Sequence, residues 1–113
     1  MNIPRILIAA PSSGSGKTVI SCGLMAAFCR QQKNVVSCKC GPDYIDPMFH
    51  REVLGIDSQN LDLFFCEKEQ LTGIFAEHAK NADLAVVEGV MGYYDGMGLD
   101  TAKASSYDVA AAL

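Results

Sequence analysis

The sequence predicts an α/β fold in which a parallel sheet lies between helices, giving three layers in all. Apolar segments of strand length alternate with amphipathic segments of helix length along the 113 residues. A loop rich in glycine and serine joins the first strand to the first helix, and polar residues follow each expected strand. Because consecutive parallel strands need a long, usually helical connection, this alternation predicts parallel strands with right-handed crossovers.

The first strand is predicted at residues 3–9 and the first helix at residues 17–32. The strand is short and apolar on both faces, which is typical of a central parallel strand. In the helix, Ile20, Leu24 and Phe28 recur every four residues. We therefore expect these three side chains to face the sheet.

The second strand is predicted at residues 35–39. The segment that follows, 40–47, contains two prolines and cannot extend the strand, because proline lacks the backbone donor. Pro47 suits a first helical turn and Asp46 suits a cap, so a short helix is expected through about Leu54.

Residues 56–66 are ambiguous and are expected to form a loop with a short extended piece at residues 61–65. A helix is predicted over residues 67–80, because one face of that segment gathers Leu71, Ile74, Phe75 and His78.

The third strand is predicted at residues 83–87, followed by Glu88, a glycine-rich loop over 89–98 and a helix over 103–113. The final apolar run has neither a C-terminal glycine nor a basic last turn, which are the usual signs of a helix end. We therefore expect the chain to be the N-terminal piece of a longer protein, with a sheet left incomplete after three strands.

The loop between the first strand and the first helix has the features of a phosphate cradle. Its backbone N–H groups and the dipole of the following helix favour an anion. Lys17 can reach the outer phosphates of a nucleotide, and the Thr18 hydroxyl can bind the accompanying Mg²⁺. The expected nucleotide-binding residues are Ser13, Gly14, Ser15, Gly16, Lys17 and Thr18.

The loop departs from the pattern G-x-x-x-x-G-K-S/T at one position, because Pro11 stands where the first glycine is expected. Proline fixes its φ angle and has no N–H, so the loop must begin differently and the cradle has one donor fewer there. A dinucleotide-binding pattern does not fit, because its third glycine would fall at Val19.

Charged residues follow the other two expected strands, at the edge of the sheet where open α/β folds bind ligands. Glu88 is predicted to hold Mg²⁺, directly or through water, opposite Thr18. Lys39 is placed to neutralise charge that develops on a phosphoryl group.

The sequence alone does not decide whether three aspartates have a functional or a structural role. Asp43 and Asp46 are held between prolines, which suits a metal or substrate site and suits turn and cap chemistry equally well. Asp95, between tyrosine and glycine, has the same ambiguity. His50 and His78 are interpreted as structural residues and receive no role.

Composition excludes several classes of protein. The net charge of −4 and the lack of a basic stripe argue against nucleic acid as a partner. No apolar run approaches the roughly 20 residues of a membrane span. The five cysteines are odd in number and form no metal-binding pair, so we interpret them as small buried side chains of a cytoplasmic protein: Cys22, Cys29, Cys38, Cys40 and Cys66.

Three segments, in order, resemble the cobyrinic acid a,c-diamide synthase family: APSSGSGKT at 10–18, KCGPDYIDP at 39–47 with His50, and EGVMGYYDG at 88–96. The proline at position 11 is shared with that family. The resemblance implies that residues 1–113 are the first part of a P-loop amidoligase domain with a fold similar to dethiobiotin synthetase. It also implies a class I glutamine amidotransferase domain beyond this chain.

The implied reaction is ATP-dependent amidation of the a and c acetate groups of cobyrinic acid in cobalamin biosynthesis, through acyl phosphates and with ammonia from glutamine. By the same resemblance, Thr18, Asp46 and Glu88 serve Mg²⁺. The implied catalytic residues are Lys17, Lys39, Asp43 and Asp95, and the implied substrate contacts are Tyr44, Asp43 and Asp95.

Several alternatives stay open. The same fold acts on hydrogenobyrinic acid or a nickel tetrapyrrole in relatives of the family. A partition-type switch ATPase carries an extra lysine at the start of the phosphate loop, where this chain has Pro11, Ser12 and Ser13. A homodimer is a further alternative for the assembly. The 113 residues alone are expected to fold only in part and to be inactive.

Overall fold

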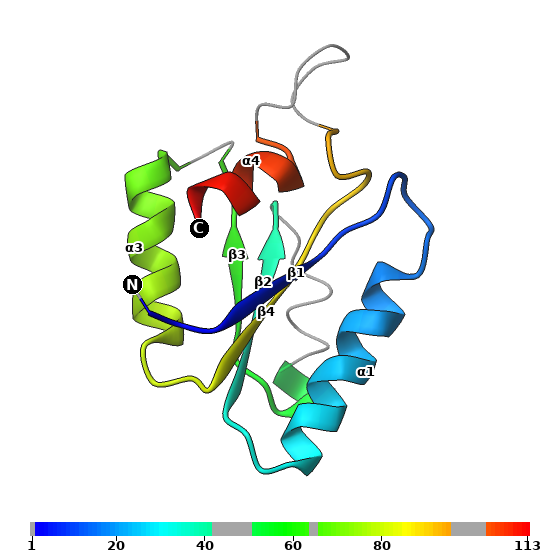
Figure 1. The fold of residues 1–113 in the computed structure, drawn as a ribbon, viewed down its shortest axis with the longest axis vertical. Coiled ribbons are helices and arrows are strands. Elements are labelled where there is room, and N and C mark those ends of the chain that lie inside the picture. The colour runs from blue at the N-terminus through cyan, green and yellow to red at the C-terminus, as the bar shows by residue number, and fades with distance from the viewer. Residues whose placement is uncertain (1, 42–50, 64–65, 96–103) are drawn as a thin grey trace.

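The α/β fold is confirmed by a computed structural model that describes residues 2–41, 51–63, 66–95 and 104–113. These residues form a four-stranded sheet in the order β1-β4-β2-β3 (Figure 1). Every neighbouring pair of strands is parallel. The strands are β1 (Arg5–Ile8), β2 (Val35–Cys40), β3 (Ser58–Leu61) and β4 (Leu84–Glu88).

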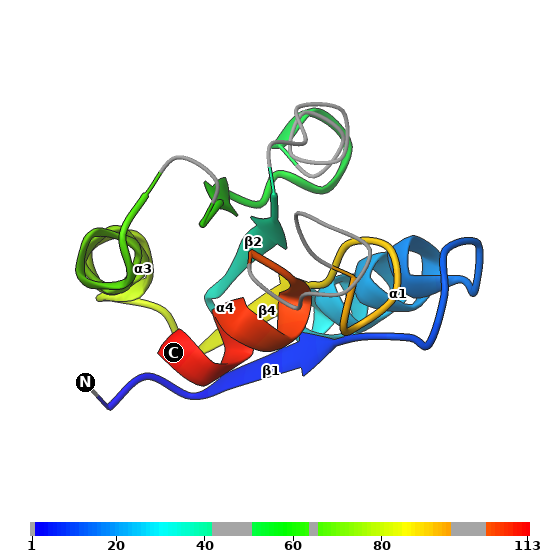
Figure 2. The ribbon, with the colours of Figure 1, turned by 90° about the horizontal axis from the view of Figure 1, so that it is seen from above.

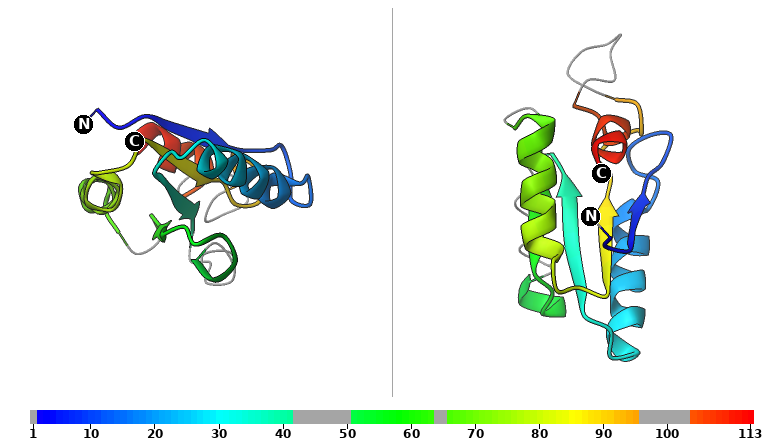
Figure 3. Two further views of the ribbon diagram at one scale, coloured as in Figure 1. Left: turned by 90° about the horizontal axis from the view of Figure 1, so that it is seen from below. Right: turned by 60° about the vertical axis from the view of Figure 1, so that its left-hand side comes forward.

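Helices cover both faces of the sheet, as the right-hand view of Figure 3 shows. One face packs against α1 (Lys17–Arg30), and the other packs against α3 (Lys68–Ala79) and α4 (Ser106–Ala112). Figure 2 shows α4 close to β1, where the Arg5 guanidinium donates to the Leu113 carbonyl over 2.6 Å.

Alternate residues of the two central strands supply the two cores. Val36, Cys38, Cys40, Ala85 and Val87 face α3 and α4, whereas Val35 and Val86 face α1. All of these side chains are buried. Because side chains alternate along a strand, Lys39 and Glu88 belong to the α1 face, at its carboxyl end.

The predicted orientation of the first helix is only partly right, because Phe28 packs against the core as expected but Ile20 does not. Ile20 is 53% exposed, and the buried stripe of α1 is instead Lys17, Ser21 and Met25, with Phe28 packed beside it. This helix carries small or apolar residues on several sides, so the spacing of its large apolar residues did not determine which side faces the sheet.

The sheet also contains a strand that the sequence pattern did not predict. β3 has the polar sequence SQNL and begins three residues before the expected extended piece at 61–65. It lies at one edge of the described sheet, where Asn60 donates its side-chain amide to the Gly41 carbonyl over 2.8 Å. β1, expected to be central, lies at the other edge.

The helix predicted at 67–80 is confirmed as α3, and it begins with a capping box between Glu67 and Gln70. His78 has the structural role assigned to it, since its Nε2 lies 3.0 Å from the Ser37 carbonyl oxygen. Residues 51–54 are helical, in agreement with the expected helix end at Leu54. The start of that helix, with His50, lies outside the described residues.

Among the described residues, Phe75 of α3 is the largest side chain that is completely buried, and it packs against the sheet. We expect Phe75→Ala to lower the free energy of unfolding by about 3–5 kcal/mol, because it removes buried apolar area and leaves a cavity. Equilibrium denaturation with urea checks this value. A loss below that of a typical surface substitution would contradict the packing described here.

Candidate active site

The loop between β1 and α1 forms a cradle open to one side of the sheet. Gly14 and Gly16 have φ angles of 74° and 87°, a left-handed conformation that strains residues with a side chain. Gly16 is also the N-cap of α1, so the following backbone N–H groups point into the loop. The loop thus has the backbone conformation that an anion-binding loop needs, and its phosphate-binding role stays a prediction.

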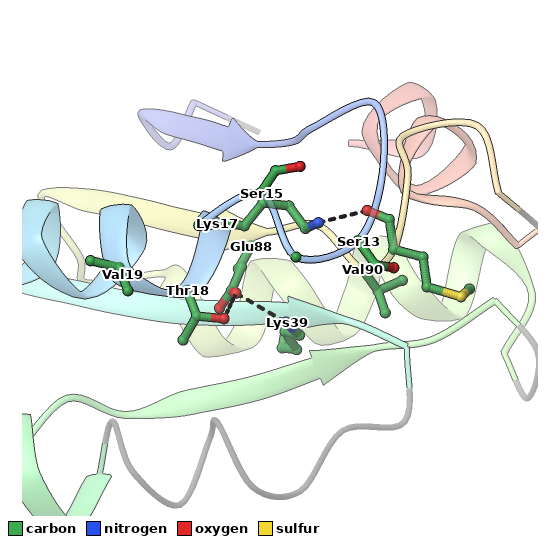
Figure 4. Close-up of a pocket in the computed structure, with 11 residues that line it drawn as sticks. Ser13, Ser15, Lys17, Thr18, Val19, Lys39, Glu88 and Val90 are labelled. Atoms are coloured by element: carbon green, nitrogen blue, oxygen red, sulfur yellow. Dashed lines mark hydrogen bonds and ion pairs between the residues drawn. The ribbon is translucent and has the colours of Figure 1, made fainter.

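A cavity of ≈ 220 Å³ lies in front of this loop. It is bounded by the phosphate loop and the first turn of α1 on one side and by the ends of β2 and β4 on the other (Figure 4). Its lining residues are Ser13, Gly14, Ser15, Gly16, Lys17, Thr18, Val19, Lys39, Glu88, Val90 and Met91. All six predicted nucleotide-binding residues are among them, together with Lys39 and Glu88.

Glu88 is the centre of the polar contacts in the cavity. Its Oε1 accepts a hydrogen bond from the Thr18 hydroxyl over 2.5 Å and lies 3.1 Å from the Lys39 ammonium nitrogen. The Glu88 and Lys39 side chains are 1% and 6% exposed. Two charges buried this deeply depend on each other, because either one alone would be costly to remove from water.

The placement of this pair follows from the sheet register. Lys39 of β2 and Glu88 of β4 are paired residues in neighbouring parallel strands. Their side chains therefore emerge side by side on the α1 face, where Thr18 of the first helical turn meets them. The sequence predicted Glu88 opposite Thr18, and the structure brings them into contact.

The second oxygen of Glu88, Oε2, is buried and has no hydrogen-bond partner among the described residues. A buried carboxylate oxygen left without a partner is unusual in folded proteins. With the adjacent Thr18 hydroxyl it fits Mg²⁺, which takes one or two protein oxygens and completes its shell with phosphate and water oxygens. In the described part of the chain, no group of three or more His, Cys, Asp or Glu side chains could hold a metal.

Lys17 contacts the loop that follows β4. Its Nζ donates to the Met91 carbonyl over 2.7 Å and to the Ser12 carbonyl over 3.4 Å. No sequence pattern predicted the contact with Met91. This contact places the Lys17 ammonium group between the phosphate loop and the loop after β4, and both loops line the cavity.

The loop after β4 packs directly against the start of the phosphate loop. The Tyr93 N–H donates to the Ala10 carbonyl over 2.8 Å, and the Gly92 N–H donates to Asp95 Oδ2 over 2.8 Å. Asp95 therefore stabilises its own loop and is not among the residues that line the cavity. Its expected catalytic and substrate-binding roles stay predictions.

Gly92 has no room for a side chain, because a Cβ there would lie 2.5 Å from the Pro11 carbonyl oxygen. We expect Gly92→Ala to separate the two loops and to lower the free energy of unfolding by about 1–3 kcal/mol, as overpacking does. The matched control is Gly73→Ala in α3, where a Cβ meets nothing within 4 Å. In thermal unfolding, the midpoint temperature of Gly73→Ala should equal or exceed that of the wild type. Equal losses of stability in Gly73→Ala and Gly92→Ala would contradict the close approach of Gly92 to Pro11.

Ser106 was missed by the sequence analysis. Its buried hydroxyl accepts from the Val90 N–H over 2.8 Å and donates to the Val90 carbonyl over 3.2 Å, which fixes the backbone next to Glu88. The sequence shows only two serines before a helix, and that pattern indicates capping. Ser105 does cap α4, by accepting from the Asp108 N–H.

The cysteines agree only partly with the expectation of buried side chains. Cys38 and Cys40 are buried, and burial raises the pKa of each thiol from 9.0 to about 12. Both therefore stay protonated at neutral pH and act as core residues. Cys29 is exposed, and Cys22 and Cys66 are intermediate.

Three predicted site residues, Asp43, Tyr44 and Asp46, lie outside the described residues. The catalytic, metal and substrate roles expected of them therefore stay predictions. Within the described ranges, no helix combines the length and the apolar character needed to cross a bilayer.

Comparisons with known proteins identify the family of this chain. A family model described as the CobQ/CobB/MinD/ParA nucleotide binding domain matches residues 6–105. A hydrogenobyrinate a,c-diamide synthase of Streptomyces coelicolor is 48% identical over 96% of this chain and 22% of its own length. Cobyrinate a,c-diamide synthases of Thermoplasma acidophilum and Methanocaldococcus jannaschii are 42% and 46% identical, over 97% and 100% of this chain.

The chain spans about a quarter of the length of these relatives, 22–25% of each. The resemblance that the three sequence segments predicted is thereby confirmed. No solved structure matches the chain significantly.

Proposed function

Because the chain belongs to the CobQ/CobB/MinD/ParA nucleotide-binding domain family, we propose that it binds ATP with Mg²⁺ and forms part of a corrinoid a,c-diamide synthase. One observation carries the proposal. Lys17, Thr18, Lys39 and Glu88, from three separate segments, line a single cavity at the carboxyl edge of the sheet. Phosphate-binding backbone, a metal-binding hydroxyl and a buried carboxylate are the parts that phosphoryl transfer requires.

The proposed reaction makes a carboxylate reactive. An oxygen of the acetate side chain attacks the γ-phosphorus of ATP, the bond to the β-phosphate oxygen breaks, and ADP leaves. Ammonia then attacks the carbonyl carbon of the acyl phosphate, and inorganic phosphate departs as the amide forms. When bound, Mg²⁺ supplies charge neutralisation on the phosphates.

The described residues have distinct tasks in this scheme. Backbone N–H groups of the phosphate loop and the Lys17 ammonium hold the outer phosphates. Thr18 and Glu88 hold Mg²⁺, and Lys39 offsets charge on the transferred phosphoryl group. We propose that Asp43, Tyr44, Asp46 and Asp95 place the acid and complete the metal site.

We further propose that the complete protein carries a class I glutamine amidotransferase domain, which releases ammonia from glutamine for the second step. This chain, a quarter of the relatives' length, would then be the nucleotide-binding part of the first domain. We also propose that the protein is cytoplasmic, since ATP and glutamine are both supplied there. We propose a homodimer as its assembly.

Three tetrapyrroles are candidates for the substrate. Cobyrinate is favoured by the printed names of the Thermoplasma and Methanocaldococcus relatives, and hydrogenobyrinate by that of the Streptomyces relative. A nickel tetrapyrrole stays a third candidate from the sequence resemblance.

The second candidate function is a switch ATPase, since the matching family also includes MinD and ParA. Such proteins carry an extra lysine at the start of the phosphate loop, where this chain has Pro11, Ser12 and Ser13. This difference favours the synthase.

The test is an assay of the full-length protein with ATP, Mg²⁺, glutamine or ammonium, and each of the acids in turn. ADP release is expected only when an acid and an ammonia source are both present. Mass spectrometry should show the mass change of two carboxyl-to-amide conversions in the preferred acid. ATP turnover that ignores every acid but rises on dimerisation would overturn the proposal in favour of the switch ATPase.

A further inference from the structure

Three tyrosine rings gather on the surface beside the phosphate loop. The Tyr93 ring meets the Tyr94 and Tyr107 rings edge to face, with centroids 4.9 and 5.6 Å away, and the Tyr94 and Tyr107 centroids are 5.3 Å apart. Tyr94 is 65% exposed and Tyr107 is 45% exposed. Because aromatic side chains contribute strongly to binding when a ligand covers them, an exposed cluster of this kind indicates a binding surface.

The tyrosine cluster borders an apolar hollow. This hollow has a volume of ≈ 410 Å³ and is lined by Ala9, Ala10, Pro11, Tyr93 and Tyr94. None of these described lining residues carries a charge. A flat apolar ring can therefore lie in the hollow without burying a charged group of the protein, which would be costly. Small side chains and aromatic rings together are typical of pockets for such ligands.

Backbone hydrogen bonds hold the tyrosine cluster in place. The Tyr93 N–H donates to the Ala10 carbonyl over 2.8 Å, and the Tyr93 carbonyl accepts from the Tyr107 N–H over 2.9 Å. Figures 1 and 2 show the segment that leaves β4 between the phosphate loop and α4. The surface is thus formed before a ligand arrives, so little conformational entropy is lost when one binds.

The hollow lies next to the cavity that holds the proposed phosphate site. On the phosphate loop, Pro11 lines the hollow and Ser13 lines the cavity. On the loop after β4, Tyr93 lines the hollow and Met91 lines the cavity. The two positions are two residues apart on each loop, a span of at most about 7 Å. A tetrapyrrole ring is wider than this span, so a ring seated in the hollow can extend an acetate side chain into the cavity.

The proposed acid matches both parts of this surface. Its macrocycle has apolar faces, and its carboxylates project from the edge of the ring. The protein correspondingly offers an uncharged hollow for the ring and the Lys17 ammonium group in the adjoining cavity. A second copy of the chain fits less well, because a stable interface takes about 20–30 residues from each partner and this surface is much smaller.

We propose that Tyr94 and Tyr107, together with the hollow, form a platform on which the macrocycle of the acid lies while one acetate group reaches the cavity. Both tyrosines are positioning residues that favour a large conjugated ring, and neither takes part in phosphoryl transfer. The proposal rests on the proposed function, and it adds a binding site for the ring to the site for the phosphates.

The test measures binding of cobyrinate, hydrogenobyrinate and a nickel tetrapyrrole to the full-length protein by calorimetry. Tyr94→Ala should weaken binding of the preferred tetrapyrrole about tenfold, since it removes one aromatic contact and the area that the ligand covers. In the amidation assay, the same variant should raise the KM for that substrate about tenfold. Its kcat and its affinity for ATP should stay those of the wild type, as expected when only substrate binding is lost.

Three further variants separate the ring from other effects. Tyr94→Phe keeps the ring and removes only the hydroxyl, so it should bind the substrate as the wild type does. Tyr107→Ala should weaken binding as Tyr94→Ala does. Ile20→Ala truncates an exposed apolar residue of α1 that lines neither the hollow nor the cavity, so it should leave binding unchanged. Circular dichroism of each variant establishes that it is folded, and Tyr94→Leu replaces any Tyr94→Ala protein that is not.

Equal substrate affinities in the wild type and Tyr94→Ala would overturn the proposal, as would a loss of ATP affinity without a loss of substrate affinity. A change of oligomeric state in Tyr94→Ala, measured by light scattering, would show that a second copy covers the rings, and would overturn it too. Failure of the proposed function looks different. The wild type itself would then bind none of the three tetrapyrroles, and the binding site for the ring would be rejected with it.

Discussion

Replacing Lys17 with alanine is expected to slow the proposed ATP-dependent amidation by about 100- to 1000-fold, the cost of losing one preorganised charge at the reacting group. The residue is 9% exposed and lies in the cavity wall, where it donates to the Met91 carbonyl. We expect the ammonium group to transfer from that carbonyl to the outer phosphates when ATP binds. The rate of ADP release measures the loss of catalytic rate, and calorimetry measures the loss of ATP affinity.

Lys33→Ala is the matched control, since Lys33 is exposed in the turn between α1 and β2, at the opposite end of the sheet from the cavity. It should retain wild-type rates and affinity. Equal rates for Lys17→Ala and wild type would show that the phosphate loop is not the site of phosphoryl transfer.

Replacing Glu88 with glutamine is expected to have two effects, one on stability and one on metal dependence. The variant keeps the shape of the side chain but leaves the buried Lys39 ammonium group without its carboxylate partner at 3.1 Å. Breaking a buried ion pair in this way costs about 3–5 kcal/mol of unfolding free energy. A neutral amide is also a poor Mg²⁺ ligand, so the Mg²⁺ concentration needed for half-maximal activity should rise at least tenfold.

Urea denaturation and a Mg²⁺ titration of the reaction measure these two effects. Glu77→Gln removes a carboxylate that is 76% exposed and pairs with Lys80 on the surface of α3. It should change stability by less than about 1 kcal/mol, as exposed pairs do. A Glu88→Gln protein that matched this control in stability would contradict the burial of the pair.

The core of the site could be predicted because it depends on short-range rules. A strand followed by a glycine-rich loop and a helix fixes the position of Lys17 and Thr18. Glu88 follows a run of apolar residues typical of a buried strand. This local pattern is enough to predict its position at the carboxyl end of that strand. Lys39 was placed by the same reasoning, and its contact with Glu88 required only that the two strands be neighbours.

The features that were missed depend on long-range packing. The Met91 carbonyl meets Lys17 across 74 positions of sequence, and Ser106 meets Val90 across 16. No local pattern encodes either contact. β3 was missed because its polar residues resemble a loop, and the α1 interface was misjudged because Lys17 itself occupies the buried stripe.

The position of β4 between β1 and β2 has a consequence for protein engineering. The segment leaving β4 touches the phosphate loop on one side and emerges beside Lys39 on the other. An insertion or a reporter group placed there would disturb the phosphate loop and the cavity together. The turn around Lys33, at the far end of the sheet, is the place for an attachment that leaves both undisturbed.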